Sequence, residues 1–504
     1  MRAKHKKKVR IKWGRFLLSI FVVVAIVFGG LLFWPISDKK PADNSSNAAN
    51  NANNVPEPPV QTEFSLLIRC AGDIMAHGPQ LDSAKRKDGS YDFTENYEYV
   101  KKYFAEADLA MGNFETTFSE DGKYTGYPAF DSPNQLAYDV MSASGIRTAL
   151  FANNHMLDSK LKGAINTVKV LKEAGFDPVV GARQTTEDPR SAVTTVNGVK
   201  VGIVSFTYET RLVNGKRTLN GSYMDADAPQ HINTFRYTTG TDKKTHVNSE
   251  DLKAIKTEMD WCRENGAEIL ICYFHWGTEY RQAPDNADKE LAQFVAENGA
   301  DIVFASHPHV LQPIQTIDIE VDYPVIEEPE PEPEPEKKPE PVKEKESWII
   351  RLRKAFGLIK EEPVKEPDPE PIEPEPEPEP KPTSWTKTGP VFWSMGNFIS
   401  NQRTETLSGT YGAAKAVLTE QGMIANVQLT YNRETGEIKY DDISCIPTWV
   451  DKYATGGRNV YKIIPLIEDL GSNPTLKASG HAKRAQNAMD MIRKLLGEEY
   501  IYKK

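Results

Sequence analysis

The chain has 504 residues, a net charge of -10 at pH 7, 26% charged residues and 34 prolines. This length would allow two or three domains of ordinary size, but stretches rich in proline and asparagine leave only part of the chain for a folded core. An acidic chain has little means of neutralising a phosphate backbone, so the composition argues against nucleic acid as a partner.

The first 34 residues have the pattern of a membrane anchor. Residues 1–15 hold eight Lys or Arg side chains and form a basic tail, and residues 16–34 are an uncharged run of nineteen. At ~1.5 Å per residue a helix over that run is roughly 28 Å long, about the thickness of a hydrocarbon core. The run is longer than the ~7 to 15 apolar residues of a cleaved signal peptide, and no Ala-x-Ala site follows it closely.

We therefore expect a single-pass transmembrane signal anchor in the cytoplasmic membrane, rather than a cleaved leader or a buried core helix. The basic flank predicts a cytoplasmic N-terminus and an extracellular position for everything after the anchor. Residues 35–62 are rich in Asn, Ala, Ser and Pro without apolar periodicity, which predicts a disordered stalk. Folding is expected over residues 63–326 and 383–504.

From residue 63 onward one pattern repeats. An apolar run typical of a strand ends in polar residues, and a stretch typical of a helix leads to the next run. The predicted strands are 65–71, 107–111, 148–152, 199–206, 268–274, 301–305 and 390–393. Ligands collect at the carboxyl ends of such strands in α/β sheets, so we expect a layered α/β fold whose site is assembled from strand-end loops.

Residues 208–248 break this pattern and are predicted to be loop, either a lid or a wall of the substrate site. Further on, residues 413–418 and 423–431 alternate as antiparallel strands do, and residues 432–436 are predicted to be the hairpin connection. Residues 474–496 are predicted to form one closing amphipathic helix. The four cysteines have no paired spacing, which argues against a disulfide framework. They are Cys70, Cys262, Cys272 and Cys445.

An insertion over residues 327–382 interrupts the folded region. Fifteen of the 34 prolines fall there, mostly in Glu-Pro repeats, which predicts two extended charged arms. Between the arms, residues 347–360 place apolar side chains on one helical face and basic side chains on the other. This pattern is typical of a helix that lies on a membrane or docks on a partner, and equally of a small helix packed on the domain.

The polar residues that follow the predicted strands supply oxygen and imidazole donors and no thiolate. They are Asp73, Glu115, Asn154, His155, His275, His307 and His309. This mixture suits Zn, Mn or Fe, and the lack of cysteine disfavours a structural zinc site. Taken alone, each has a simpler explanation: Gly-Asp usually forms a turn, Asn154 could cap a helix, and Glu115 could form a surface ion pair. Their common placement favours a shared site.

Six motifs, in this order, resemble the CapA capsule-synthesis family, which is associated with poly-gamma-glutamate capsules. They are Gly72-Asp73-Ile-Met75, Gly112-Asn113-Phe-Glu115, Ala152-Asn-Asn-His155-Met-Leu-Asp158, His275-Trp-Gly-Thr-Glu279, Ser306-His-Pro-His-Val310 and Ser394-Met-Gly-Asn-Phe398. The resemblance covers about residues 64–325 and 388–430. That family is in turn similar to the calcineurin-like metallophosphoesterases, so the resemblance implies a four-layer αββα sandwich that holds two metals above the strand ends.

The resemblance also implies roles for individual residues. The expected metal ligands are Asp73, Glu115, Asn154, His275, His307 and His309. His155 is expected to act as a general acid or to stabilise the charged transition state, with Asp158 as its orienting partner. The expected substrate-binding residues are His77, Glu279 and Asn397.

Two departures from the phosphoesterase pattern affect the metal count. Met75 stands in place of the first-motif histidine, and Glu115 closes the motif where those enzymes carry a bridging aspartate. Loss of that charge favours one firmly held divalent ion, Mn, Zn or Fe, or else two ions with Glu115 or His77 substituting.

The implied activity is metal-assisted hydrolysis or transfer at a phosphate ester or at an amide of a polymer. The alternative is a non-catalytic scaffold that binds the polymer within a capsule synthesis and export complex. The expected partners are the cytoplasmic membrane, an anionic capsule or cell-wall polymer, and capsule synthase and exporter subunits.

Overall fold

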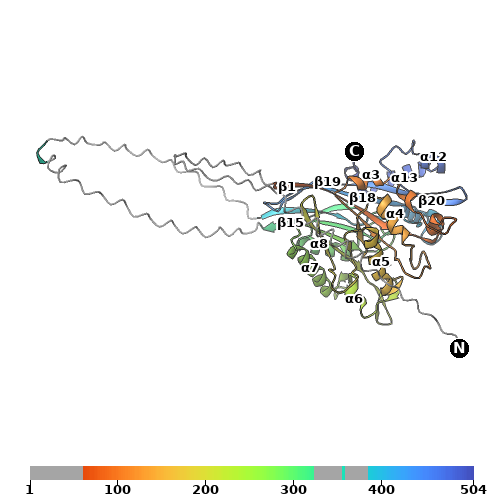
Figure 1. Cartoon of the computed structure of the whole chain (residues 1–504), viewed down its shortest axis with the longest axis horizontal. Helices are drawn as coiled ribbons and strands as arrows, with labels where there is room; N and C mark the ends of the chain where they lie inside the picture. Colours follow the sequence, from red (N-terminus) through yellow and green to blue (C-terminus); the bar gives the residue numbers. More distant parts are fainter. Residues whose placement is uncertain (1–60, 323–354, 358–383, 504) are drawn as a thin grey trace, which may run out of the picture. The chain divides into compact units, whose positions relative to one another are not determined.

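The computed structural model describes residues 61–322, 355–357 and 384–503 (Figure 1). The basic tail, the predicted anchor, the stalk up to residue 60 and nearly all of the insertion, including most of the helix predicted over 347–360, lie outside these residues. Within the described residues, no helix has both the length and the apolar character needed to cross a membrane.

The first sheet has the strand order β20-β19-β18-β1-β2-β3-β4, and β17 pairs with β1. Its strands are β1 (Glu63–Ile74), β2 (Leu109–Phe114), β3 (Thr148–Leu150), β4 (Val179–Val180), β17 (Asn397–Ile399), β18 (Gln421–Asn432), β19 (Ile438–Thr455) and β20 (Arg458–Pro465). The pairs from β1 to β4 are parallel, whereas β18, β19 and β20 add on antiparallel. The carboxyl ends of β1, β2 and β3 therefore lie at one edge of this sheet.

The second sheet has the order β10-β6-β13-β14-β16-β15, and β5 pairs with β6. Its strands are β5 (Ala192–Val196), β6 (Val199–Tyr208), β10 (Thr234–Phe235), β13 (Ile269–His275), β14 (Ile302–Ser306), β15 (Ile314–Asp322) and β16 (Ser384–Phe392). The pairs from β6 through β13 and β14 to β16 are parallel, as the continuous apolar runs of these strands predicted. The seven predicted strands are all present, with boundaries shifted by a few residues.

Buried side chains form three clusters. The largest takes residues from both sheets, including Leu66 and Ile68 of β1 and Ile271 of β13. The second joins the first sheet to α2 (Gly78–Ala84), α3 (Lys101–Glu106), α4 (Gln135–Ala143) and α5 (Lys160–Ala174). The third joins the second sheet to α7 (Ser249–Glu264) and α8 (Asn286–Glu297), drawn in green in Figure 1. The four cysteines are buried and free, as their spacing predicted.

Residues 208–248 contain more regular structure than predicted. The strands β7 (Thr210–Val213), β8 (Lys216–Leu219) and β9 (Ser222–Tyr223) form a small antiparallel sheet, and β11 (Tyr237–Thr239) pairs with β12 (Thr245–Val247). A four-residue helix, α6 (Ala228–His231), lies between them. The prediction of loop was wrong because strands of two to four residues are too short to show a period.

Two predictions for the C-terminal part were also wrong. The supposed strand over 413–418 is helical, with α10 (Thr404–Tyr411), α11 (Ala413–Ala416) and then a 3-10 turn, as the helix propensity of its alanines favours. The closing helix is two helices, α12 (Pro474–Ser479) and α13 (Ala482–Leu496), because Gly480 adopts φ 75° and ends the first. Residues 432–436 do connect β18 to β19. Further 3-10 turns span Thr94–Tyr97 and Glu498–Tyr500.

The insertion is attached at the end of the second sheet that is remote from the strand-end motifs. Strands β15 and β16 pair antiparallel from Ile314 opposite Phe392 to Asp322 opposite Ser384. Because β16 runs parallel to β14, the pair Asp322 and Ser384 lies at the edge where β14 begins.

Replacing residues 327–382 with a short Gly-Ser linker should therefore change the free energy of unfolding by no more than ~0.5 kcal/mol, as for surface changes away from packed features. Bound metal content should also be unchanged. Thermal unfolding and elemental analysis of the linker variant and the wild type test this, and loss of soluble protein would contradict it.

Candidate metal site

Asp73 is brought into the site by an irregularity in β1. The register between β1 and β2 shifts between Ala71 and Asp73, which is a bulge that re-aims the aspartate. A Cβ atom on Gly72 would lie 2.0 Å from the carbonyl oxygen of Gly396, so only glycine permits this close approach. The N–H of Asp73 donates to the same oxygen at 3.0 Å, and the Asn113 amide donates to Asp73 Oδ1 at 2.8 Å.

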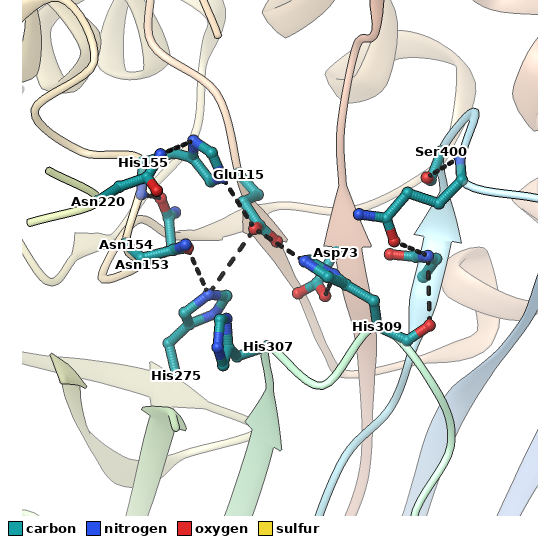
Figure 2. Close-up of polar contacts among 12 residues, drawn as sticks. Asp73, Glu115, Asn153, Asn154, His155, Asn220, His275, His307, His309 and Ser400 are labelled. Atoms are coloured by element: carbon teal, nitrogen blue, oxygen red, sulfur yellow. Dashed lines mark hydrogen bonds and ion pairs between the residues drawn. The ribbon is translucent and has the colours of Figure 1, made fainter. Parts of the chain in front are cut away.

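Glu115 lies at the centre of the site. It follows the last residue of β2, and its N–H donates to Ile74 O at 3.0 Å. Both of its carboxylate oxygens are buried and have no hydrogen-bond partner among the described residues. The Nε2 atoms of His155, His275 and His309 each lie 3.8 Å from Glu115 Oε1 (Figure 2). Three imidazoles from three strand ends thus converge on one carboxylate oxygen.

His155 is held in a defined orientation beyond the end of β3. Its Nδ1 lies 2.6 Å from Asp158 Oδ2, and its backbone N–H donates to Asn153 Oδ1 at 3.1 Å. A carboxylate only accepts, so this contact keeps the ring proton on Nδ1 and leaves Nε2 facing Glu115. The Asn220 amide, from the turn between β8 and β9, lies 3.5 Å from Asp158 Oδ1.

His275 ends β13 and is fully buried. Its Nε2 lies 2.9 Å from Asn154 Oδ1, which joins the two predicted ligands, and its Nδ1 has no partner among the described residues. His307 Nδ1 is likewise unpartnered there, whereas His307 Nε2 lies 3.0 Å from the Tyr208 hydroxyl. Two ring nitrogens are therefore buried without a hydrogen bond.

His307 and His309 both adopt positive φ, at 106° and 56°, in the loop after β14. Residues with a Cβ rarely occupy this region, and such backbone strain is found mostly at functional sites. His309 Nδ1 lies 3.1 Å from Asp73 Oδ2. The strained loop thus places one imidazole against Asp73 and the other against Tyr208.

Burial changes the protonation of these groups. Burial and then the neighbouring Asp73 raise the pKa of Glu115 well above its ordinary value. Burial and then the neighbouring histidines lower the pKa of His275 and of His307. Burial also lowers the pKa of His309, but the hydrogen bond and charge of Asp73 outweigh it and leave that pKa raised. The site therefore combines a Glu115 carboxyl group whose ionised form is penalised, two imidazoles, His275 and His307, that are kept neutral, and a third, His309, whose protonated form Asp73 favours.

These residues fit a divalent metal ion. Asp73, Glu115 and His309 each offer a ligand atom, and the three atoms lie within 4.8 Å of one another. Unpartnered buried carboxylate oxygens and imidazole nitrogens are the donors that Mn, Zn and Fe prefer. The orientation of His155 and His309 by carboxylates is also typical of metal ligands.

The three predicted substrate-binding residues lie outside this group of donors. Asn397 is buried behind His309, with its amide donating to His309 O at 3.3 Å and to Thr419 O at 2.9 Å. His77 is the N-cap residue of α2, its Nδ1 receives the Asn401 N–H at 3.3 Å, and burial lowers its pKa to about 3. Glu279 is exposed and adds negative charge near Glu115.

Four residues that support the site were not predicted from the sequence. They are Asn113, Asn153, Tyr208 and Asn220. The first two stand inside motifs that were recognised, so the strand-end rule could have found them. Tyr208 is the last residue of β6, two residues beyond the predicted end of that strand, and it opens the segment predicted to be loop. Asn220 lies in the segment predicted to be loop, where the sequence carries no such signal.

A buried carboxyl group next to the site gives a pH prediction. Asp288 of α8 accepts from the Tyr237 hydroxyl at 2.5 Å and from the Asp285 N–H at 3.2 Å, and burial raises its pKa to about 7. The native protein keeps this proton up to about pH 7, whereas the unfolded chain releases it near its ordinary pKa of ~3.9. Stability from this group is therefore full below pH 4 and is lost as the pH rises to 7.

Asp288→Asn should remove that loss, of which about 2.7 kcal/mol falls between pH 5 and pH 8 because the pKa is about 7. Urea unfolding of the wild type and the variant at pH 5 and pH 8 tests the prediction. Equal losses of stability between the two pH values in both proteins would contradict it.

The fold and the site together define an α/β protein with a candidate site for a divalent metal. The chain matches the family described as bacterial capsule synthesis protein PGA_cap over residues 68–326, and it belongs to that family. The resemblance inferred from the six motifs is thereby confirmed.

Curated relatives match about half of the chain. The capsule biosynthesis protein CapA of Bacillus anthracis is 29% identical over 254 residues, which are 49% of this chain and 55% of the relative. The PGA biosynthesis protein CapA of Bacillus subtilis (strain 168) is 25% identical over 264 residues, 52% of this chain and 62% of the relative. The chain therefore covers less than two thirds of either relative. Among solved structures, a novel phosphatase from Mycoplasma pneumoniae is 11% identical with a TM-score of 0.34, covering 76% of this chain and 93% of the other.

Proposed function

We propose that this chain is a metal-dependent hydrolase or transferase of capsule synthesis that acts on a phosphate ester or on an amide of a polymer. The observation that carries the proposal is the convergence of three imidazole Nε2 atoms on the unpartnered Glu115 Oε1, each at 3.8 Å. A divalent ion bound there would lower the pKa of a bound water and polarise the scissile group. The names of the curated relatives support the role in capsule synthesis.

The ion would be Mn, Zn or Fe, and the geometry favours one firmly held ion over two. The residues that would hold it combine two carboxylates, one amide and three imidazoles. They are Asp73, Glu115, Asn154, His275, His307 and His309. His77 receives a backbone N–H from Asn401, so its Nδ1 is already used within the protein.

His155 is the residue proposed to move a proton. Asp158 holds its Nδ1–H, so Nε2 is the atom that can accept or donate on the side of Glu115. Asn153 accepts the backbone N–H of His155 at 3.1 Å and so helps to hold this residue in place. Glu279 is exposed and its charge acts on Glu115, which supports its proposed role in substrate binding.

The proposal includes the larger architecture and the location. The three buried clusters support a four-layer αββα order, with one cluster between the sheets and one beneath the helices on each outer face. The basic tail and uncharged run support a membrane-anchored, extracellular domain. Its partners there would be an anionic capsule or cell-wall polymer and the capsule synthase and exporter subunits.

Purified full-length protein in detergent tests the activity. Bound metal is measured by elemental analysis, and turnover is measured on a model phosphodiester and on poly-gamma-glutamate. His155→Ala should lose at least ~100-fold in turnover and keep its metal, because it removes proton transfer alone. His307→Ala should lose metal as well. His231→Ala, at a histidine outside the site, is the control.

A metal-free wild type would overturn the proposal. The proposal would also be overturned if the wild type bound the polymer without turnover and the His155→Ala variant bound it equally well. That second result would instead support the polymer-binding scaffold.

A further inference from the structure

A second cavity, of about 670 Å³, lies beside the metal site on the His307 side. Its walls come from the end of β6, the β11–β12 hairpin, the loop after β13 and the first turn of α8. Tyr208 connects it to the site, because this residue lines the cavity and its hydroxyl lies 3.0 Å from His307 Nε2. Gly277, two residues after His275, lines the cavity as well and donates its N–H to the Tyr237 hydroxyl at 3.3 Å.

The charges in this cavity are unbalanced. Glu209 is paired with Arg217, and Asp285 is paired with Arg281. Arg211 and Lys244 also line the cavity, are exposed, and form no ion pair or side-chain hydrogen bond within the part of the chain that the structure describes. Two uncompensated positive charges therefore face this space in a chain whose net charge is -10.

Asp242, two residues before Lys244, makes no ion pair with the Lys244 ammonium group among the contacts of the described residues. The carboxylate of Asp242 lies 3.0 Å from His246 Nε2, and it accepts the backbone N–H of Lys244 rather than its ammonium group. The Lys244 ammonium group is left to interact with a ligand. Unpaired cations in a concave site favour anions both in binding and in the rate of encounter.

Another pocket near the site is lined by a different set of side chains. It measures about 340 Å³, has no Lys or Arg in its walls, and is lined by His77 and the tyrosines Tyr127, Tyr280 and Tyr411. Tyr280 links it to the site, since its N–H donates to Pro308 O at 2.8 Å. Of these two pockets, the 670 Å³ cavity is the one with Lys and Arg side chains in its walls.

We infer that the 670 Å³ cavity is the subsite for an anionic group of the substrate, a carboxylate or a phosphate, with Arg211 and Lys244 as its charge partners. The inference rests on the proposed function, because it assigns the substrate class of the same site. The volume is within the ~300 to 1,000 Å³ of ordinary ligand pockets, so the cavity has room for more than the anionic group itself.

The test titrates two probes into the full-length protein, inorganic phosphate and a short gamma-linked glutamate oligomer, with isothermal calorimetry as the measurement. The double variant Arg211→Gln, Lys244→Gln should bind phosphate or the glutamate oligomer at least about tenfold more weakly, because it loses two charge-assisted contacts. Its affinity should also depend less on salt. The probe that loses affinity identifies carboxylate or phosphate as the bound group.

Lys87→Gln, Lys494→Gln is the matched control, because both lysines are exposed, neither lines the cavity, and the net charge changes equally. Unchanged binding in the Arg211, Lys244 variant would overturn the inference, and so would equal weakening in the control. Metal content measured on the same samples separates the two proposals. If the wild type holds no metal, and the Arg211, Lys244 variant alone binds the probe more weakly, the proposed metal-dependent activity is rejected and the anionic subsite is supported.

Discussion

Glu115→Gln is expected to abolish tight binding of a divalent ion, with a loss of affinity greater than the ~10 to 100-fold caused by changes outside the ligand shell. The substitution keeps the size of the side chain and removes the charge on which three imidazoles converge. Titration of Mn or Zn into chelator-treated protein measures the affinity. If the variant bound the metal with wild-type affinity, Glu115 would not be a metal ligand.

The same variant should be more stable than the wild type when both are metal-free. Burial and the neighbouring Asp73 penalise the ionised Glu115, and the amide removes a cost of about 1 kcal/mol or more. Metal at 100 times its Kd should add about 2.7 kcal/mol to the wild type and nothing to the variant.

If Glu115 is a metal ligand, Glu115→Gln raises the free energy of unfolding of the metal-free protein and removes the stabilisation by metal. A residue that only stabilises the fold would not combine these two results. Urea unfolding with and without metal provides the measurement, and Glu264→Gln, at an exposed position of α7, is the control. A metal-free variant less stable than the wild type would show that Glu115 stabilises the fold instead.

Gly72→Ala is expected to destabilise the protein by about 3 kcal/mol or more, at the upper end of overpacking substitutions. The added Cβ would lie 2.0 Å from Gly396 O, and both partners of this contact are backbone. The displaced strand would also move Asp73, so metal affinity should fall together with stability.

Gly78→Ala is the matched control, since a Cβ there meets nothing within 4 Å. Denaturant midpoints and metal affinities of the two variants give the comparison. If Gly72→Ala yields no soluble protein while Gly78→Ala does, the steric argument also holds. Equal midpoints for the two variants would refute it.

The sequence predicted the strands and the strand-end motifs because apolar runs and polar stops are local signals. His275 ends β13 and His307 follows β14, and these two strands pair in parallel, so the nearness of the two histidines follows from the strand order. The positive φ of His307 and His309 could not be predicted, because such strain is imposed by tertiary contacts and has no compositional signal.

The parts missed have different physical causes. Asn220 reaches the site from a turn between strands of four and two residues, which are too short for periodicity. The stretch Ala413-Ala-Lys-Ala416 was predicted to begin a strand, but it contains three alanines, and their intrinsic helix propensity prevails there. The attachment of the insertion far from the motifs depends on the direction of β15, which only strand pairing reveals.

The donors of the site are divided between the two sheets. Asp73, Glu115 and His155 follow strands of one sheet, whereas His275 and His309 follow strands of the other. An ion held by both sets would act as a cross-link between the sheets, joining positions such as Asp73 and His309 that are 236 residues apart. Metal affinity would then depend on how well the two sheets are held together.

Truncating a side chain of the buried cluster that takes residues from both sheets, such as Ile271, would therefore weaken metal binding without touching a ligand. Conversely, removal of the ion would loosen the whole interface between the sheets rather than a single loop. Metal affinity would therefore report on the stability of the whole domain as well as on the ligands themselves.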